Sequence, residues 1–255
     1  MPTPDKIDAL RLNGEVVSLA DVLKELTIAD DNQYRSVVAS RLIVRREAAL
    51  RDLSVSDSEL QQAADAFRLQ RGLSTAAATK AWLADRLWSV DDFEQHLEFP
   101  LLSSKLESVV GSPDAIERHF ANNGRTYDRA EISHVVVADQ KIADELLAQL
   151  NDDDADFGDL ARLHSIDPLT ARLGGRIGVT DRASLSTAIE TAVFAALDGD
   201  VVGPLQTAMG WHLILVDRVI PGRLDDEISD LIRTELFQRW LDAQLERVEF
   251  PPIRI

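Results

Sequence analysis

The spacing of apolar residues divides the chain into two helical ends and a mixed middle. Over roughly the first 125 residues, apolar side chains recur at i, i+3 and i+4 behind Ser and Asp residues, the pattern of capped helices with one buried face. Ser56 with Glu59 fits a capping box, and Ser112 precedes a proline at the first position of a helix. The sequence therefore predicts a layer of helices with short connections.

The period of the apolar pattern changes in the middle of the chain. Residues 131–137 and 211–219 have the apolar, β-branched composition of strands, and they enclose three segments with helical spacing. The three predicted helices lie near 139–150, 157–164 and 186–197. This order predicts an α+β fold with a small antiparallel sheet surrounded by helices.

The two chain ends are expected to form one domain. Residues 9–18 predict a hairpin whose turn is Asn13–Gly14, a pair that tolerates positive φ. Residues 224–248 again carry a helical apolar stripe, which needs a partner surface. We expect this closing helix to pack on the N-terminal helices and the tail after it to pair with the hairpin. The predicted domains are an all-α domain at 1–127 plus 221–255 and an inserted α+β domain at 128–220.

Composition excludes several classes of function. The 44 acidic and 27 basic residues give a formal charge of −17, which opposes binding to nucleic acid or to an anionic membrane surface. The chain has no cysteine, so disulfides, thiolate catalysis and Cys-ligated zinc are excluded. No GxSxG, HExxH or P-loop motif supports a common hydrolase or nucleotide site.

Acidic residues are concentrated in the predicted α+β domain, where residues 130–219 hold 15 acidic and 6 basic side chains, a net charge of −9. The run Asp152–Asp154 with Asp156 lacks the loop length and the distal Glu of an EF-hand, which favours a solvated loop over a metal site. We therefore expect neither a metal nor a cofactor.

The sequence also predicts where the protein works. No segment approaches the length of a membrane span, and the N-terminus lacks a basic stretch followed by an apolar one. We expect a cytoplasmic protein without a membrane span, or a periplasmic one if a signal segment has been removed. The sequence leaves the oligomeric state open.

Two histidines on the predicted strands mark the candidate site. His134 lies on the first strand and His212 on the second, and the segment between them contains Asp167 and three closely spaced glycines that allow sharp turns. Four patterns follow one another in this domain: SH, FxxLAxxxSxD, GGxxG and GP followed by T and GxH. Their residues are Ser133, His134, Phe157, Leu160, Ala161, Ser165, Asp167, Gly174, Gly175, Gly178, Gly203, Pro204, Thr207, Gly210 and His212. In this order they resemble a parvulin-type peptidyl-prolyl cis/trans isomerase.

The resemblance implies isomerisation of X-Pro peptide bonds in proline-containing polypeptide clients. Rotation about such a bond meets a barrier of roughly 18–20 kcal/mol, and no covalent bond has to break. By the same resemblance, His134 and His212 orient a hydrogen-bonded network that Thr207 joins. Asp167 acts electrostatically on the twisting amide. A purely orienting and packing role for the two histidines stays open.

The resemblance also implies an apolar cup for the proline ring. Leu185 and Ile189 occupy positions that many parvulins fill with Met and Phe, and the loss of an aromatic floor lowers the contact area with proline. The predicted cup residues are Ile177, Leu185, Ile189, Phe194 and Met209. Apolar residues at these spacings also suit an ordinary core, so both interpretations stay open.

The chain lacks the basic loop with which phosphate-directed parvulins bind their substrates. The segment after the first strand is Ala138–Gln140, and Lys141 is its nearest basic residue. A phosphate needs several charge-assisted hydrogen bonds. We therefore expect clients without a phosphate requirement.

The flanking helices and the NGE turn resemble the helical chaperone body of SurA-like and PrsA-like isomerases, which implies that this body binds unfolded segments. Three hypotheses follow. The first is an active isomerase with a client-binding body, and the second is a catalytically weak holdase or adaptor. The third is an accessory for one exported or modified peptide.

Overall fold

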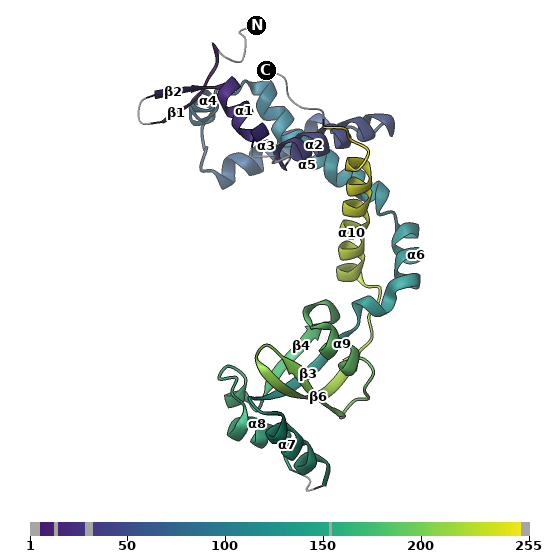
Figure 1. The fold of residues 1–255 in the computed structure, drawn as a ribbon. Helices are drawn as coiled ribbons and strands as arrows, with labels where there is room; N and C mark the ends of the chain where they lie inside the picture. Colours follow the sequence, from purple (N-terminus) through teal and green to yellow (C-terminus); the bar gives the residue numbers. More distant parts are fainter. Residues whose placement is uncertain (1–5, 13–14, 29–32, 153–154, 251–255) are drawn as a thin grey trace. The chain divides into compact units, whose positions relative to one another are not determined.

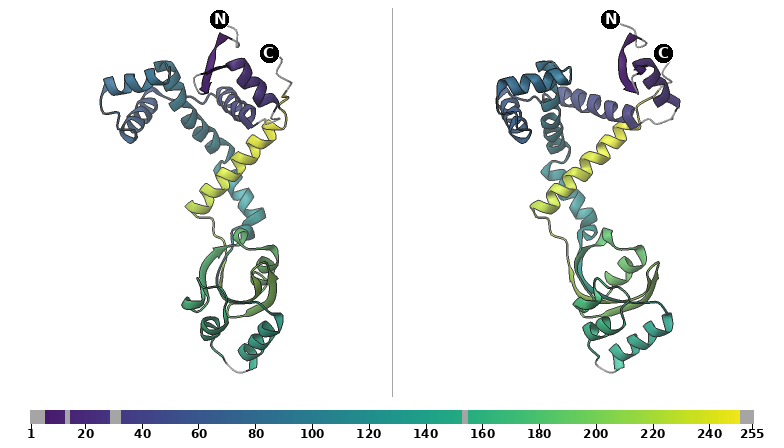
Figure 2. Two further views of the ribbon diagram at one scale, coloured as in Figure 1. Left: turned by 60° about the vertical axis from the view of Figure 1, so that its left-hand side comes forward. Right: turned by 90° about the vertical axis from the view of Figure 1, so that its left-hand side faces the viewer.

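The computed structural model describes residues 6–12, 15–28, 33–152 and 155–250. The chain divides into two compact units, Met1–Ala115 with Leu231–Ile255 and Ile116–Asp230 (Figures 1 and 2). The second unit holds a four-stranded sheet and extends beyond the domain predicted at 128–220, because parts of the flanking helices are grouped with it.

The first unit is helical apart from a hairpin. Its strands β1 (Asp8–Leu12) and β2 (Glu15–Ser18) pair antiparallel, which confirms the hairpin, while the predicted turn Asn13–Gly14 lies outside the described residues. Its helices are α1 (Leu19–Ile28), α2 (Gln33–Leu50), α3 (Asp57–Gln70), α4 (Ala76–Asp85) and α5 (Val90–Val110). Helix α6 (Pro113–Asn123) begins in this unit, and α10 (Asp226–Leu245) ends in it.

The predicted helix starts and the closing helix are confirmed. Ser56 and Glu59 form a capping box at the start of α3, and α6 begins at the proline that follows Ser112. The Thr234 hydroxyl of α10 donates to Glu107 of α5 at 2.9 Å, so the closing helix returns to the N-terminal helices. Residues 251–255, which belong to the tail predicted to pair with the hairpin, lie outside the described residues.

The second unit contains an antiparallel sheet in the strand order β4-β3-β6-β5. The strands are β3 (Arg129–Val137), β4 (Arg176–Asp181), β5 (Val201–Thr207) and β6 (Gly210–Ile220). The helices are α7 (Gln140–Asp152), α8 (Phe157–His164) and α9 (Thr187–Val193), with 3₁₀ turns η2 (Gly124–Tyr127), η3 (Ala171–Leu173) and η4 (Arg182–Ser184). This is the predicted α+β fold.

The two faces of this sheet are covered by different helices (Figure 1). One face packs Val135, Val137 and Leu213 against α7 and α8, whose inward residues are Ala143, Leu146, Phe157, Leu160 and Ala161. The other face packs Ile132, Ile214 and Val216 against Val193 of α9. Because side chains alternate along a strand, the central strands supply both cores at once.

Two strands and one helix end differ from the pattern in the sequence. Strand β4 carries only two alternating apolar residues, Ile177 and Val179, and both are exposed, so the apolar pattern did not predict it as a strand. Strand β5 is broken by a register shift between Val202 and Leu205, where Gly203–Pro204 interrupts the apolar run. The helix predicted at 186–197 ends at Val193, and residues 194–200 form turns before β5.

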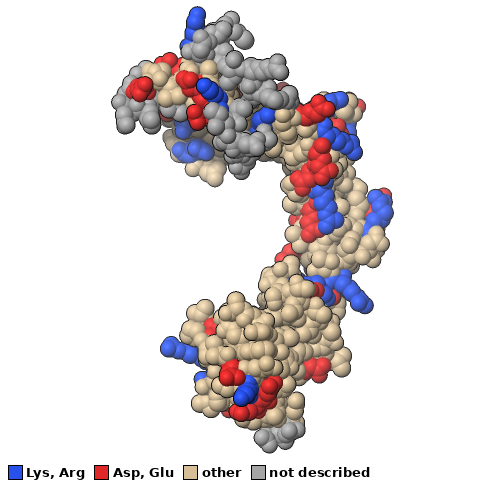
Figure 3. Space-filling model, viewed as in Figure 1, with Lys and Arg blue, Asp and Glu red and all other residues tan. Residues whose placement is uncertain are grey.

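Charged side chains are mixed over the surface drawn in Figure 3, and the Lys and Arg residues of the sheet-containing unit are scattered on that face. None of the helices in the described part of the chain combines the length and the hydropathy of a membrane span.

Candidate active site

Neighbouring strands β3 and β6 bring the two histidines together. In the antiparallel register His134 lies opposite Ile214 and Val136 lies opposite His212, so both imidazoles project from the same face of the sheet. Both side chains are buried, and their ring centroids are 5.5 Å apart. This is the face that α9 covers at its other end.

The segment after α8 reaches this face along the free edge of β3. The pairing of β4 with β3 runs from Arg129 as far as Ser133. Beyond Ser133, the Ile166 amide donates to the Val136 carbonyl at 2.8 Å. The Ser165 hydroxyl accepts the Val136 amide at 3.2 Å. These contacts anchor the loop that carries Asp167.

A glycine turn closes the same loop against the strand. The His134 amide donates to the Gly175 carbonyl at 2.8 Å, and Gly175 has a φ of 82°. A Cβ at this position would lie 2.3 Å from the His134 carbonyl oxygen. The backbone therefore requires glycine here both for its conformation and for the close approach.

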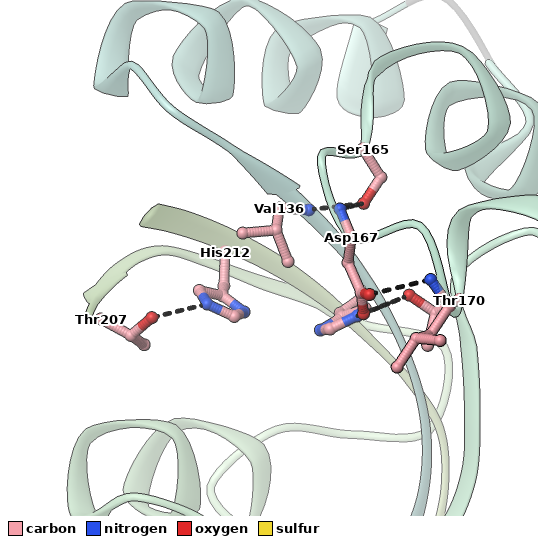
Figure 4. A network of polar contacts seen from close by, with 8 residues as sticks. Val136, Ser165, Asp167, Thr170, Thr207 and His212 are labelled. Carbon is pink, nitrogen blue, oxygen red and sulfur yellow. Dashed lines mark hydrogen bonds and ion pairs between the residues drawn. The ribbon is translucent and has the colours of Figure 1, made fainter. Parts of the chain in front are cut away.

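Asp167 accepts hydrogen bonds at both carboxylate oxygens (Figure 4). The Thr170 hydroxyl donates to Oδ2 at 2.7 Å, and the Leu169 amide donates to Oδ1 at 3.0 Å. His134 Nε2 lies 2.9 Å from Asp167 Oδ2 and 2.8 Å from Thr170 Oγ1. Since the threonine proton goes to the carboxylate, Nε2 of His134 carries the proton that both oxygens accept.

These hydrogen bonds keep the carboxylate ionised. The bond from Thr170 lowers the pKa of Asp167 most, and the Leu169 amide and His134 lower it further, against the opposing effect of burial. The site therefore holds a fixed negative charge beneath the imidazole at neutral pH.

His212 forms a second arm of the network (Figure 4). Its Nε2 lies 2.7 Å from the Thr207 hydroxyl oxygen, which also accepts the Met209 amide at 3.1 Å. Burial lowers the pKa of His212, and the nearby His134 lowers it further, so the ring is neutral at neutral pH. Its Nδ1 is buried without a hydrogen-bond partner in the described part of the chain.

The four residues predicted to carry the chemistry lie in these two arms. Asp167 and His134 belong to one arm, Thr207 and His212 to the other, and the two arms meet through the contact of the imidazole rings. Thr170, which bonds both His134 and Asp167, was not predicted from the sequence. Its signal was the spacing in SIDPLT, where a hydroxyl three residues after the aspartate can return to the carboxylate.

The five predicted cup residues separate into two groups. Leu185, Ile189 and Phe194 are partly buried and pack on the apolar end of the histidine face, against the cluster of Ile132, Val193 and Val216. Ile177 and Met209 are 44% and 57% exposed. The first group forms a wall continuous with the core, and the second group lies on the surface.

Comparison with known proteins gives the class of this domain. Residues 128–218 match the rotamase family described as "PPIC-type PPIASE domain". The sheet unit is therefore a parvulin-type peptidyl-prolyl isomerase domain, the class that the SH, SxD and GGxxG patterns predicted.

Relatives extend the similarity into the helical unit. The chain is 26% identical over 240 residues to the foldase protein PrsA of Halalkalibacterium halodurans, covering 89% of this chain and 70% of that protein. It is 35% identical over 107 residues to a probable parvulin-type peptidyl-prolyl cis-trans isomerase of Bordetella bronchiseptica, covering 42% of this chain and 41% of that protein. The crystal structure of the PrsA isomerase from Bacillus cereus shares the fold over 95% of this chain and 90% of its own, with a TM-score of 0.56 and 20% identity.

Proposed function

We propose that the parvulin domain isomerises X-Pro bonds in unfolded or peptide clients, without a phosphate requirement, and that the helical unit binds those clients. One observation carries this proposal: a buried network of His, Asp and Thr side chains shares a sheet face with an apolar wall. The wall offers proline a surface, and the network offers oriented polar groups beside it.

Such a site suits a reaction in which no bond is broken. Twisting the X-Pro amide removes its resonance, and a catalyst has only to favour the twisted form over the planar one. Preorganised dipoles and charges do this without reorganisation cost. In this proposal the ionised Asp167 acts electrostatically and orients His134, while Thr207 orients the neutral His212.

Phosphate independence rests on how the basic residues are used. Of the six Lys and Arg residues between 130 and 219, four are paired with carboxylates. These four are Arg162, Arg176, Arg182 and Arg218. A phosphorylated client would need several basic groups at one place, and the paired arginines are already engaged.

The client-binding role of the helical unit rests on a cavity of about 440 Å³ between α3, α4 and α5. Leu60, Leu83, Phe93 and Leu97 line it with apolar surface, and charged residues such as Lys80 stand at its rim. Mixed grooves of this kind can accept unfolded segments with low sequence selectivity.

The relatives do not support the cytoplasmic location predicted from the N-terminus. The other location predicted from the sequence, the periplasm, is the one that we propose.

The decisive experiment measures cis-to-trans conversion on a panel of X-Pro peptides, including matched Ser-Pro and phospho-Ser-Pro pairs. We expect catalysis by the full chain, equal or lower rates on the phosphorylated member, and loss of at least tenfold in kcat/KM in Asp167→Ala and His212→Ala. The matched controls are Asp144→Ala and His164→Ala, which change exposed residues of the same domain. Rates no faster than buffer across the panel contradict the isomerase.

A second candidate function, a holdase or adaptor with weak catalysis, is favoured by the two aliphatic residues of the wall. Leu185 and Ile189 offer proline no aromatic face. Suppression of client aggregation that survives in Asp167→Ala, together with the absence of catalysis, would select this second function.

A further inference from the structure

Arg182 is a partly buried cation that the proposed chemistry does not use. It is the first residue of η4, between β4 and α9, and its side chain is 22% exposed. Its guanidinium donates to Glu190 Oε1 at 2.6 Å and to Asp128 Oδ2 at 3.3 Å, and it lies 3.9 Å from the centre of the Phe194 ring. Three partners from different parts of the domain therefore meet at one side chain.

Two of these partners belong to the segment that carries the wall of the predicted proline cup. Glu190 lies on α9 and Phe194 caps its end, and between η4 and Glu190 the chain supplies the cup residues Leu185 and Ile189. The guanidinium thus contacts the second half of the segment that forms the wall, and Arg182 itself lies three residues before its first residue, Leu185.

The third partner ties the wall to the frame of the domain. Asp128 immediately precedes β3, and its other oxygen accepts the amide of Gly222, which follows β6, at 2.9 Å. One carboxylate therefore links the beginning of the sheet, the segment after its last strand, and Arg182.

The guanidinium remains in this place although its Nε is buried without a partner in the described part of the chain. An unpaired buried donor is unfavourable, so the other contacts determine its position. Lysine is not equivalent here, since its compact ammonium lacks the planar, rigid fork that donates to two carboxylates while its face stacks on a ring.

We propose that Arg182 is a positioning residue, which fixes the wall of α9 over the histidine face and thereby sets the affinity for proline. This inference rests on the proposed function. The polar network itself is anchored by β3, β6 and the loop after α8, so removal of Arg182 should change binding more than turnover.

The test compares Arg182→Gln and Arg182→Lys with Arg176→Gln in the full chain. Arg176 is the matched control, because it is an exposed arginine of the same domain whose ion pair with Glu131 joins β4 to β3 and involves no residue of α9. A proline-containing peptide is titrated by NMR, isomerisation is followed by exchange spectroscopy, and hydrogen–deuterium exchange maps the backbone.

For Arg182→Gln we expect a roughly tenfold higher Kd or KM, a kcat within about twofold, and faster amide exchange confined to residues 185–194. The Kd and exchange rates of Arg182→Lys should lie between those of wild type and Arg182→Gln. Glu190→Gln should reproduce the Arg182→Gln pattern, and the double variant should show no larger effect than either single variant. Arg176→Gln should leave all three readouts within about twofold.

Two results overturn the inference. In the first, Arg182→Gln accelerates exchange evenly over the whole domain, which indicates a general loss of stability. In the second, it leaves the peptide Kd and the exchange of 185–194 like those of Arg176→Gln. If the wild-type chain binds the peptide but does not isomerise it, the proposed isomerase function is refuted and the inference about Arg182 is not. Peptide binding and amide hydrogen exchange then still decide the role of Arg182. Where the wild type binds no peptide, the exchange pattern decides it.

Discussion

The two faces of the parvulin sheet are built by the same strands but use their side chains differently. On the face covered by α7 and α8, Val135, Val137 and Leu213 meet an apolar layer and carry no polar group. On the other face, His134 and His212 lie at one end, and Ile132 and Val216 pack in an apolar cluster at the other end. The first face holds none of the four predicted catalytic residues, and its buried polar residue Ser133 bonds Asp217, whereas the second face divides its length between packing and the polar network.

This comparison explains how buried polar groups are tolerated beside a core. Burial of an unpaired imidazole or carboxylate is costly. Here Asp167 has three donors and each histidine has a hydroxyl partner at Nε2, which leaves His212 Nδ1 without a partner in the described part of the chain. The apolar face supplies the stability that lets the other face hold a polar network. Substitutions on the two faces should therefore separate stability from activity.

The largest effect is expected on the face that α7 and α8 cover. Leu213 is fully buried next to His212 in sequence, and Leu213→Ala should lower the free energy of unfolding by about 3 kcal/mol through lost contacts and a cavity. Activity per folded molecule should stay within about threefold. Urea unfolding with parallel activity measurements checks this, and a stable but inactive Leu213→Ala would break the comparison.

The next effect concerns the glycine turn that joins the loop to β3. Gly175→Ala places a methyl group against the His134 carbonyl at a positive φ and should cost about 2–3 kcal/mol. Gly178 also has a positive φ but open space around its Cβ position, so Gly178→Ala should cost only about 1–2 kcal/mol. Thermal unfolding of both variants measures the difference, and equal losses would show that the close approach is unimportant.

A smaller effect, confined to activity, is expected from the Thr170 hydroxyl, which was not predicted from the sequence. Thr170→Val removes a donor to Asp167 and an acceptor for His134, and should lower kcat/KM by about tenfold, or about 1.4 kcal/mol. Thr191→Val is the control, because its hydroxyl bonds only its own helix on α9. Steady-state kinetics decide between them, and equal rates in both variants would remove Thr170 from the site.

The smallest effect is a dependence of stability on pH. The pKa of His212 is lowered in the folded chain by burial and by His134. Below the pKa of about 6.5 that the group has in the unfolded chain, the unfolded chain therefore binds a proton that the folded chain does not bind. Stability should fall as pH drops from 6.5 toward the folded pKa, by at most about 1.4 kcal/mol per pH unit. Urea titrations between pH 7 and 5 should show a shallower slope in His212→Gln, and an unchanged slope would assign the proton elsewhere.

Much of the fold follows from local patterns. Capping boxes, the proline at the start of α6 and the apolar period of β3 and β6 each depend on neighbours in sequence, and these predictions agree with the structure. Strands β4 and β5 were not predicted, because the first has only two alternating apolar residues, both exposed, and the second is interrupted by Gly203–Pro204. Their positions depend on pairing with β3 and β6, which is not local.

The sequence alone determined the class of the domain, because ordered motifs such as SxD and GGxxG record which residue types the turns and the site require. The tertiary structure alone decided how those residues are used. The strand register places His134 and His212 on one face of the sheet. The loop along the free edge of β3 places Asp167 and Thr170 within hydrogen-bond distance of His134. Arg182 contacts Asp128, which is 54 residues away in the sequence. The reason is physical: residue type and local spacing fix what a side chain can do, whereas hydrogen-bond partners far apart in the chain are chosen only when the sheet is assembled.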